Sequence, residues 1–382
     1  MNVDCEMNFG PDELRSQGKS KQLGSVRFLT HFGRILLFGC HLPIRNPSKR
    51  FPQAVPRLVF TTDLFVLAVQ LMPNSESHSF EGSTIAISGA SGLVGTALTN
   101  SLQADGAKVV AISRSSKGKN SNPIVWDPET GLLNPDRLND VDTVIHLAGE
   151  GIASGRWNKQ QKAKIRDSRV KGTASLVNSI AQISNRPKTF ICASAIGFYG
   201  DRADEVLTED AAAGTGFLPD VSVQWEAAAA AASQLGMRVV KVRIGVVLSP
   251  HGGALQKMLL PFRMGMGGVV GSGKQYWSWI GLHDLVRVFS FCASHSQVSG
   301  AVNAVSPMPV TNREFTKTLG SVLKRPTLIP VPRLLARLAL GEMADDLLLA
   351  SAKVVPQRLE QLGFEFQYPT LKESIQFELQ QK

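Results

Sequence analysis

A short apolar run followed at once by three regularly spaced glycines occupies residues 84–95, TIAISGASGLVG. The run predicts a buried strand, and residues 93–105 have the apolar spacing of a helix. Glycine tolerates positive φ angles and lets two backbone segments approach closely. Gly89, Gly92 and Gly95 therefore predict a sharp turn from the strand into the helix. A unit of this kind favours a fold in which strands and helices alternate.

The same alternation continues to about residue 250. Strands that alternate with helices of this length form a parallel sheet that is covered on both faces. We therefore predict an α/β fold, a doubly wound parallel sheet with a small, mainly helical C-terminal appendage. The predicted strands lie at 84–88, 108–113, 123–127, 142–149, 189–194 and 238–248, and the predicted helices at 93–105, 157–184 and 221–236.

The pattern divides the chain into three predicted regions. Residues 83–325 carry the α/β pattern, and 326–382 form the C-terminal region. Residues 1–82 show no clear fold pattern, and we interpret them as a poorly structured extension, with Met72 as an alternative start. The other interpretation is a targeting segment. The expected location is the cytoplasm, or an organelle if the extension is a transit segment.

Composition excludes several classes of protein. The 382 residues carry a net charge of +10 but no dense run of Lys and Arg, which argues against a nucleic-acid partner. No apolar run of about 18 residues occurs, so no integral membrane contact is expected. The four cysteines form no CxxC pair or Cys/His cluster, which argues against a metal site. We expect a small-molecule, anionic ligand, and the sequence leaves the oligomeric state open.

A strand, a glycine turn and a helix in this order form the context of a dinucleotide-binding loop. The first glycine permits the turn, the second gives the pyrophosphate access to backbone, and the third lets helix and strand pack closely. The amides at the start of the helix favour phosphate charge. The alternative is a glycine-rich turn without a ligand.

The end of the second predicted strand indicates which dinucleotide is bound. NAD-binding folds commonly place an acidic residue there to bind a ribose hydroxyl. Here Ser113 and Arg114 occupy the place, with Ser115 and Lys117 close by. Because arginine binds phosphate with two parallel hydrogen bonds, NADP (NADPH) is favoured over NAD. The alternative is a solvated basic turn.

Longer motifs resemble those of an atypical extended short-chain dehydrogenase/reductase, the SulA-like or YfcH-like epimerase family. The resemblance spans nearly all of residues 83–369 and implies a Rossmann-like domain, NADP binding and a family-specific C-terminal domain, with the substrate undefined. The family label also suggests a link to cell division. The motifs are SGASGLVG, VIHLAGE, RWNKQQKAKIRDSRVKGT, SAIGFYGD, WEAAA, RIGVVLSPHGGAL, LPFRMGMGGVVGSGKQYWSWI and PVPRLLARLALGEMADDLLLASAKVVPQRLEQLGFEF.

The resemblance also implies a set of cofactor contacts. The glycine loop would hold the pyrophosphate, Ser113 and Arg114 the adenosine phosphate, and the end of the fourth strand the adenine and ribose. His146, in that strand, is expected to be a core residue. The implied cofactor-binding residues are Gly89, Ser91, Gly92, Leu93, Val94, Gly95, Ser113, Arg114, Leu147, Ala148, Gly149, Lys164, Arg169 and Val247.

Members of this family commonly use a Tyr-x-x-x-Lys pair, in which Tyr is the acid or base and Lys lowers its pKa. Here Val221 and Trp225 stand near the expected positions. Ser194, near the usual catalytic serine, and Tyr199, at the mouth of the fifth strand, are the candidate catalytic residues, although Ala195 is an alternative equivalent of that serine. Two functions remain open, an NADP-dependent oxidoreductase or epimerase and a non-catalytic NADP(H)-dependent sensor or scaffold.

Overall fold

The computed structural model describes residues 79–114, 123–132 and 134–381. The chain divides into two units, Met1–Met72 and Pro73–Lys382, and every described residue lies in the second. Ser115, Lys117 and nearly all of the expected N-terminal extension lie outside the described residues. The predicted boundaries at residues 82 and 325 stay predictions.

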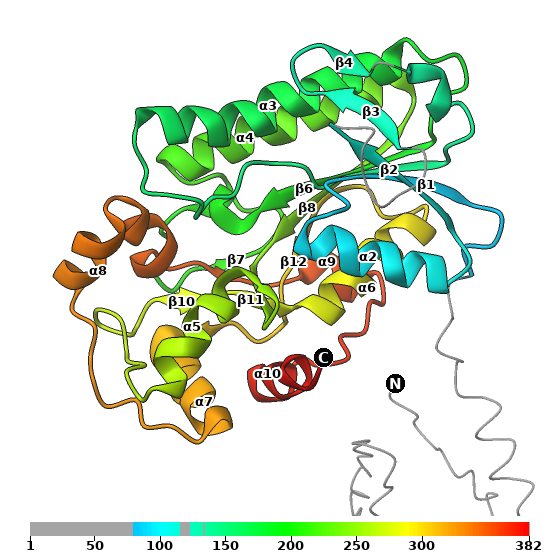
Figure 1. Cartoon of the computed structure of the whole chain (residues 1–382). Helices are drawn as coiled ribbons and strands as arrows, with labels where there is room; N and C mark the ends of the chain where they lie inside the picture. Colours follow the sequence, from blue (N-terminus) through cyan, green and yellow to red (C-terminus); the bar gives the residue numbers. More distant parts are fainter. Residues whose placement is uncertain (1–78, 115–122, 133, 382) are drawn as a thin grey trace, which may run out of the picture. The chain divides into compact units, whose positions relative to one another are not determined.

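An eight-stranded sheet forms the centre of the described fold, in the order β12-β8-β6-β5-β1-β2-β3-β4 (Figure 1). All neighbouring strands in it are parallel except β3 and β4. The predicted doubly wound parallel sheet is therefore confirmed. Its strands are β1 (Thr84–Ser88), β2 (Lys108–Ser113), β3 (Ile124–Asp127), β4 (Gly131–Leu132), β5 (Thr143–His146), β6 (Thr189–Ala195), β8 (Arg238–Ile244) and β12 (Gly300–Ala304).

Helices cover both faces of this sheet. Successive side chains of a strand point to opposite faces, and apolar side chains on both faces of β1 are buried under helices. Ile85 and Ile87 of β1 pack with α2 (Leu93–Ala104) and α6 (Leu282–Ser294). Ala86, between them, belongs to the core under α3 (Lys159–Ala181) and α4 (Phe217–Ala230). Figure 1 shows the two helix pairs on opposite sides of the sheet. No described helix is long and apolar enough to cross a bilayer.

The strand order reverses between β1 and β5. From β1 the chain adds β2 and β3 on one side, and then returns to place β5 on the other side of β1. Ser88, at the end of β1, pairs with Ile112 of β2 and with His146 of β5. Ligands of open α/β sheets bind outside the carboxyl ends of the strands at such a reversal. Gly89 and Leu147, which follow β1 and β5, lie at this reversal, where the general rule predicts a ligand crevice.

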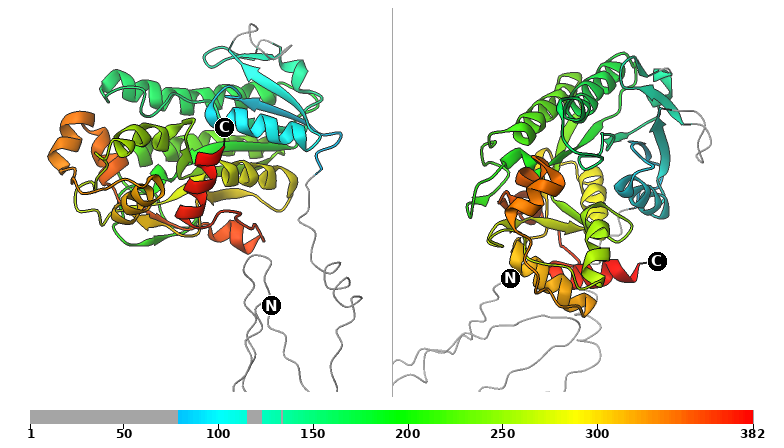
Figure 2. Two further views of the ribbon diagram at one scale, coloured as in Figure 1. Left: turned by 60° about the horizontal axis from the view of Figure 1, so that its bottom comes forward. Right: turned by 60° about the vertical axis from the view of Figure 1, so that its left-hand side comes forward.

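A second group of elements packs at the same end of the sheet. Leu255 of α5, Phe315 of α7 and Ile375 of α10 share a core with Trp279. Figure 2 shows α10, in red, close to α7. The predicted C-terminal helical region is confirmed. The elements of this group are β7 (Val206–Leu207), β9 (Val246–Ser249), α5 (Gly253–Arg263), β10 (Tyr276–Trp277), β11 (Trp279–Gly281), β13 (Val310–Thr311), α7 (Asn312–Leu323), α8 (Arg333–Leu340), β14 (Lys353–Val354), α9 (Gln357–Gln361) and α10 (Leu371–Gln380).

The single strand predicted over 238–248 is wrong, because the chain leaves the sheet at Gly245. There the amide of Gly245 donates to Ala304, and the next strand, β9, pairs with β11 instead. A Cβ at Gly245 would lie 2.8 Å from the carbonyl oxygen of Ser278, so only glycine fits the crossing. The sheet position beside β8 is completed by β12, which the sequence patterns did not predict.

Candidate cofactor-binding site

The turn after β1 requires glycine at two of its three glycine positions. Gly89 has φ +72°, and a Cβ there would lie 2.9 Å from the amide nitrogen of Ala148. A Cβ at Gly95 would lie 2.2 Å from the carbonyl oxygen of Gly89. At Gly92 the nearest atom would be 3.3 Å away, which is less restrictive. At Gly89 the turn lies too close to the loop after β5 to admit a side chain. At Gly95 helix α2 lies too close to the turn to admit one.

The first turn of α2 has no side-chain cap. Its N-cap residue is Gly92, which has extended backbone and provides no side-chain hydrogen bond. Ser91 and Gly92 are exposed, whereas Leu93 and Val94 are half-buried. The first amides of a helix carry partial positive charge and lack partners within the helix. An anionic group is the natural partner for this helix end.

Ser88 and His146 hold the neighbouring loop in place. The hydroxyl oxygen of Ser88 accepts from the amides of Leu147 at 3.2 Å and Ala148 at 3.3 Å, and it lies 2.7 Å from Nδ1 of His146. Burial lowers the pKa of His146 to about 4, so its ring is neutral near pH 7. The expectation that His146 is a core residue is confirmed. The pair fixes Leu147 and Ala148 beside the glycine turn.

A groove of about 820 Å³ runs along α3 and reaches Arg114 at the end of β2. Lys164 and Lys171 of α3 line the same groove, together with the acidic residues Glu129, Glu150 and Asp167. Arg114 and Lys164 are exposed, and Ser113 is half-buried. The structure thus brings two residues that lie fifty positions apart in the sequence, Arg114 and Lys164, to one concave surface.

Arg169 lies at the junction of the loop after β5 and helix α4. Its Nη1 donates to the carbonyl oxygens of Glu150 at 2.9 Å and Ile165 at 3.1 Å. The guanidinium carbon lies 5.1 Å from the ring centre of Trp225, and a Cβ at Gly149 would lie 3.5 Å from it. Burial lowers the pKa of Arg169. The guanidinium of Arg169 therefore lies against the backbone of Gly149 and Glu150, in the loop after β5.

Val247 reaches the same region from β9. Its carbonyl oxygen would lie 3.4 Å from a Cβ at Gly253, and that Cβ would lie 3.9 Å from Leu93. Leu93 is the first residue of α2. Val247 is therefore close to the start of the helix that follows the glycine turn.

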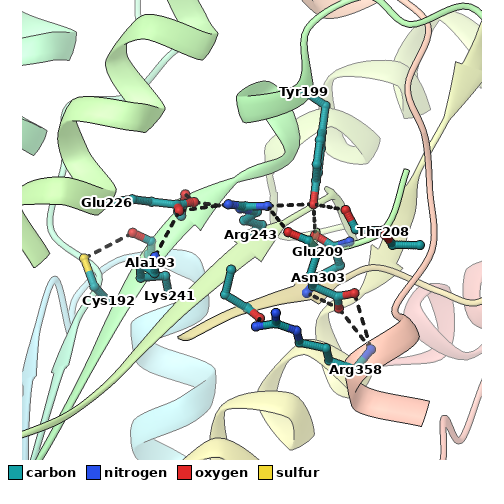
Figure 3. A network of polar contacts seen from close by, with 12 residues as sticks. Cys192, Ala193, Tyr199, Thr208, Glu209, Glu226, Lys241, Arg243, Asn303 and Arg358 are labelled. Carbon is teal, nitrogen blue, oxygen red and sulfur yellow. Dashed lines mark hydrogen bonds and ion pairs between the residues drawn. The ribbon is translucent and has the colours of Figure 1, made fainter. Parts of the chain in front are cut away.

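The two candidate catalytic residues belong to one buried polar network, in which Figure 3 labels Tyr199, Arg243 and Glu226. The hydroxyl of Ser194 donates to Oε1 of Glu226 at 2.8 Å. Arg243 donates to both carboxylate oxygens of Glu226, at 2.8 and 3.0 Å, and Lys241 lies 3.6 Å from Oε2. Ser194, Glu226 and Arg243 are all buried. The carboxylate of Glu226 therefore has two cationic side chains, Lys241 and Arg243, within 4 Å.

Tyr199 joins the network from its other side. Its hydroxyl oxygen accepts from Nη1 of Arg243 at 2.9 Å, and its proton faces the oxygens of Asn303 at 2.7 Å and Thr208 at 3.0 Å. Tyr199 is 0% exposed, and burial raises the pKa of its phenol. The backbone N–H of Asn303 in turn donates to Oε1 of Glu209 at 2.9 Å. Tyr199 therefore follows the end of β6 in sequence but has no exposed surface there.

Sequence patterns did not single out Glu226, Arg243 or Asn303. These residues come from α4, β8 and β12, three elements distant in sequence. One signal was present, because Lys241 and Arg243 alternate with apolar residues in β8, whose only other charged residue is Arg238. Charged side chains in a buried strand require partners, which here come from α4.

Helix α4, which follows β6, contains neither tyrosine nor lysine. Val221 and Trp225 are 4% and 6% exposed, so both are core residues of the α3–α4 side. Ala195, the last residue of β6, is half-buried, whereas its neighbour Ser194 is 3% exposed. Of these two residues, Ala195 is the more accessible at the end of the strand.

Comparison with known proteins agrees with this geometry. Residues 85–304 match the NAD dependent epimerase/dehydratase family, and residues 331–377 match a domain of unknown function, DUF1731. An epimerase family protein of Mycobacterium bovis is 44% identical over 291 residues, which cover 76% of this chain and 96% of that protein. The chloroplastic SDR39U1 homologue of Arabidopsis thaliana is 35% identical over 299 residues, covering 76% and 85%.

A solved structure shares the fold. The crystal structure of human epimerase family protein SDR39U1 with NADPH superposes with a TM-score of 0.70 and 31% sequence identity. The match covers 77% of this chain and 98% of the human one.

Proposed function

Because the chain belongs to the NAD-dependent epimerase/dehydratase family, we propose that it binds NADP(H) in the crevice beside β1 and β5. The observation that carries this proposal is the groove that Arg114 shares with Lys164 and Lys171. Arg114 and Lys164 there favour the extra 2′-phosphate that distinguishes NADPH from NADH, whereas Lys171 is paired with Asp167 at 2.9 Å. The human relative crystallised with NADPH supports the same assignment.

The residues of the crevice fit such a cofactor. The uncapped start of α2 and the backbone of Ser91, Gly92 and Leu93 would hold the pyrophosphate. Gly89, Val94 and Gly95 would keep the turn in the required shape. When bound, NADPH supplies a hydride.

The remaining proposed contacts lie around the loop after β5. Leu147, Ala148 and Gly149 would line the adenine and ribose side, with Arg169 beneath Gly149. Val247 would border the opposite wall, next to Leu93. Ser113 and Arg114 would bind the phosphate of the adenosine.

We further propose that any oxidoreductase or epimerase chemistry on a small molecule proceeds without the Tyr-x-x-x-Lys pair. The absence of Tyr and Lys from α4 supports this, as does the burial of Val221 and Trp225. Ser194 and Tyr199 are the hydroxyl groups nearest in sequence to the end of β6. Since both are buried in the Glu226–Arg243 network, we assign them a positioning role that holds Ala195 at the crevice.

A second candidate is an NADP(H)-dependent sensor or scaffold that does not turn over. One observation favours it, namely that the network already engages the hydroxyls of Ser194 and Tyr199. Titration with NADPH tests the binding that both candidates share. Incubation of the NADPH complex with carbonyl compounds and nucleotide sugars then separates them, because only an enzyme oxidises NADPH or changes the sugar.

For localisation we propose the cytoplasm, with an organelle as the second candidate because the Arabidopsis relative is named chloroplastic. Imaging of the full chain fused at its C-terminus to a fluorescent protein distinguishes the two.

A further inference from the structure

Large apolar side chains are exposed mainly in one part of the described chain. The structure exposes twelve such residues, and eight of them fall within 260–266 and 328–338. We call these eight the leucine patch. Its members are Leu260 (67%), Met264 (62%), Met266 (50%), Leu328 (85%), Ile329 (56%), Leu334 (68%), Leu335 (55%) and Leu338 (63%).

The two stretches that form the leucine patch lie side by side. Arg325 donates to the carbonyl oxygen of Arg263 at 2.9 Å, and Val331 donates to that of Val269 at 2.8 Å. Between these bonds, a Cβ at Gly268 would lie 1.5 Å from the carbonyl oxygen of Ile329. The segment before α8 therefore runs along the segment after α5, and α8 continues from the end of this pairing.

Helix α8 turns its leucines away from the core. Of its eight residues only Ala336 is buried. Leu334 and Leu338 are one turn apart on the helix, and Leu335 lies beside Leu338. Figures 1 and 2 show α8, in orange, at the margin of the described fold. Many large apolar side chains exposed in one region of a protein commonly mark a surface that binds something.

The charges around the leucine patch have a single sign. No Asp or Glu occurs from residue 227 to 283 or from 315 to 341. The exposed cations in or next to the patch are Lys257, Arg263, Lys324, Arg325, Arg333 and Arg337. Acidic side chains appear only at its edge, where Asp345 pairs with Arg337 and Glu342 with Lys162.

We propose that the leucine patch docks on the surface of an anionic phospholipid membrane. Exposed leucines beside exposed arginines match a bilayer interface, where apolar side chains enter the acyl boundary and cations face lipid phosphates. Basic residues near an anionic leaflet add attraction that falls with salt. A second copy of this chain would bring like charges together, so charge complementarity favours lipid over self-association.

The test uses the full chain and sedimentation with phosphatidylcholine vesicles, prepared with or without phosphatidylglycerol. We expect binding to the anionic vesicles, weak binding to the neutral ones, and loss of binding as salt is raised. The combined variant Leu334→Ser, Leu335→Ser, Leu338→Ser should bind anionic vesicles about tenfold more weakly or worse. Val206→Ser, at an apolar residue 52% exposed on β7, is the matched control and should bind as the wild type does.

An unchanged melting temperature of the triple variant would show that it folds. A second variant, Lys324→Glu, reverses one charge beside the leucine patch and leaves α8 intact. Binding of the triple variant and of Lys324→Glu that equals wild-type binding would overturn the proposal. Absence of wild-type binding would also overturn it, as would a dimer in light scattering that the triple variant dissociates while neither protein binds vesicles.

Discussion

The guanidinium of Arg243 donates a 2.9 Å hydrogen bond to the hydroxyl of Tyr199 inside the protein, where Tyr199 has no exposed surface. The same guanidinium holds Glu226, which accepts the hydroxyl proton of Ser194. One buried cation thus connects both hydroxyls that the sequence places near the end of β6. Their shared partner supports a role in fixing the strand end, and this role has measurable consequences.

Tyr199→Phe should destabilise the protein by about 1–3 kcal/mol, because Arg243 and Asn303 each lose one buried hydrogen bond, the one to the phenol. Affinity for NADPH should change little, because the hydroxyl lies below the crevice. Urea unfolding measures the first effect and calorimetric titration the second. Tyr276→Phe is the control, since that ring is half-buried beneath Lys353. A stable Tyr199→Phe protein that no longer binds NADPH would contradict the positioning role.

Oxidation of simple alcohols with NADP at pH 7 should be undetectable. That direction needs a base, and burial raises the pKa of Tyr199 rather than lowering it. The assay is the absorbance of NADPH formed from a panel of alcohols, with the wild type and with Tyr199→Phe. Rapid oxidation that persists in Tyr199→Phe would show that another residue supplies the base.

Gly95→Ala should disrupt the glycine turn. The new Cβ would lie 2.2 Å from the carbonyl oxygen of Gly89, so α2 must shift away from β1. We expect a loss of about 1–3 kcal/mol in stability and weaker NADPH binding. Gly155→Ala is a matched control, because no atom lies within 4 Å of a Cβ there. Equal melting temperatures and NADPH affinities for the two variants would show that the turn is less tightly packed than described.

Glu378 should make stability depend on pH. Burial raises its pKa to about 7, against 4.5 as the ordinary value, while its Oε1 accepts from the amide of His283 at 2.9 Å. Between these pH values the folded protein keeps a proton that the unfolded chain releases. The stability that this proton contributes is present below pH 4.5 and is lost as pH rises through 7.

Glu378→Gln retains an acceptor oxygen and removes the titration. Its melting temperature relative to the wild type should therefore be more favourable at pH 8 than at pH 5. A difference in melting temperature between the two proteins that is the same at pH 5 and pH 8 would contradict the raised pKa of Glu378.

The sequence predicted the sheet well where the signal is local. Apolar runs such as 84–88, with glycines after them, define buried parallel strands and a turn whose shape the backbone itself requires. The prediction failed at Gly245, because the sequence of β8 and β9 has the pattern of one continuous strand. The break between them depends on the close approach of the Ser278 backbone to Gly245, which is a contact distant in sequence. β12 was missed because GAVNA is short and weakly apolar.

In the candidate site, too, the sequence predicted the features that depend on neighbouring residues and missed those that depend on distant contacts. The glycine turn and Arg114 follow from neighbouring residues, whereas the buried network depends on contacts between residues such as Tyr199 and Asn303, which are 104 positions apart. No period in the sequence encodes that pairing. The sequence therefore placed Tyr199 after β6 but did not reveal its buried partners.

The most direct test of the account compares the affinities of NADPH and NADH by calorimetric titration. Wild-type protein should bind NADPH more tightly, and Arg114→Ala should weaken NADPH roughly ten- to a hundredfold while NADH changes little, because only NADPH carries the 2′-phosphate. Lys317→Ala, which removes one exposed cation from α7, should leave both affinities unchanged. Equal wild-type affinities for NADPH and NADH, or equal losses for both in Arg114→Ala, would contradict the proposed site.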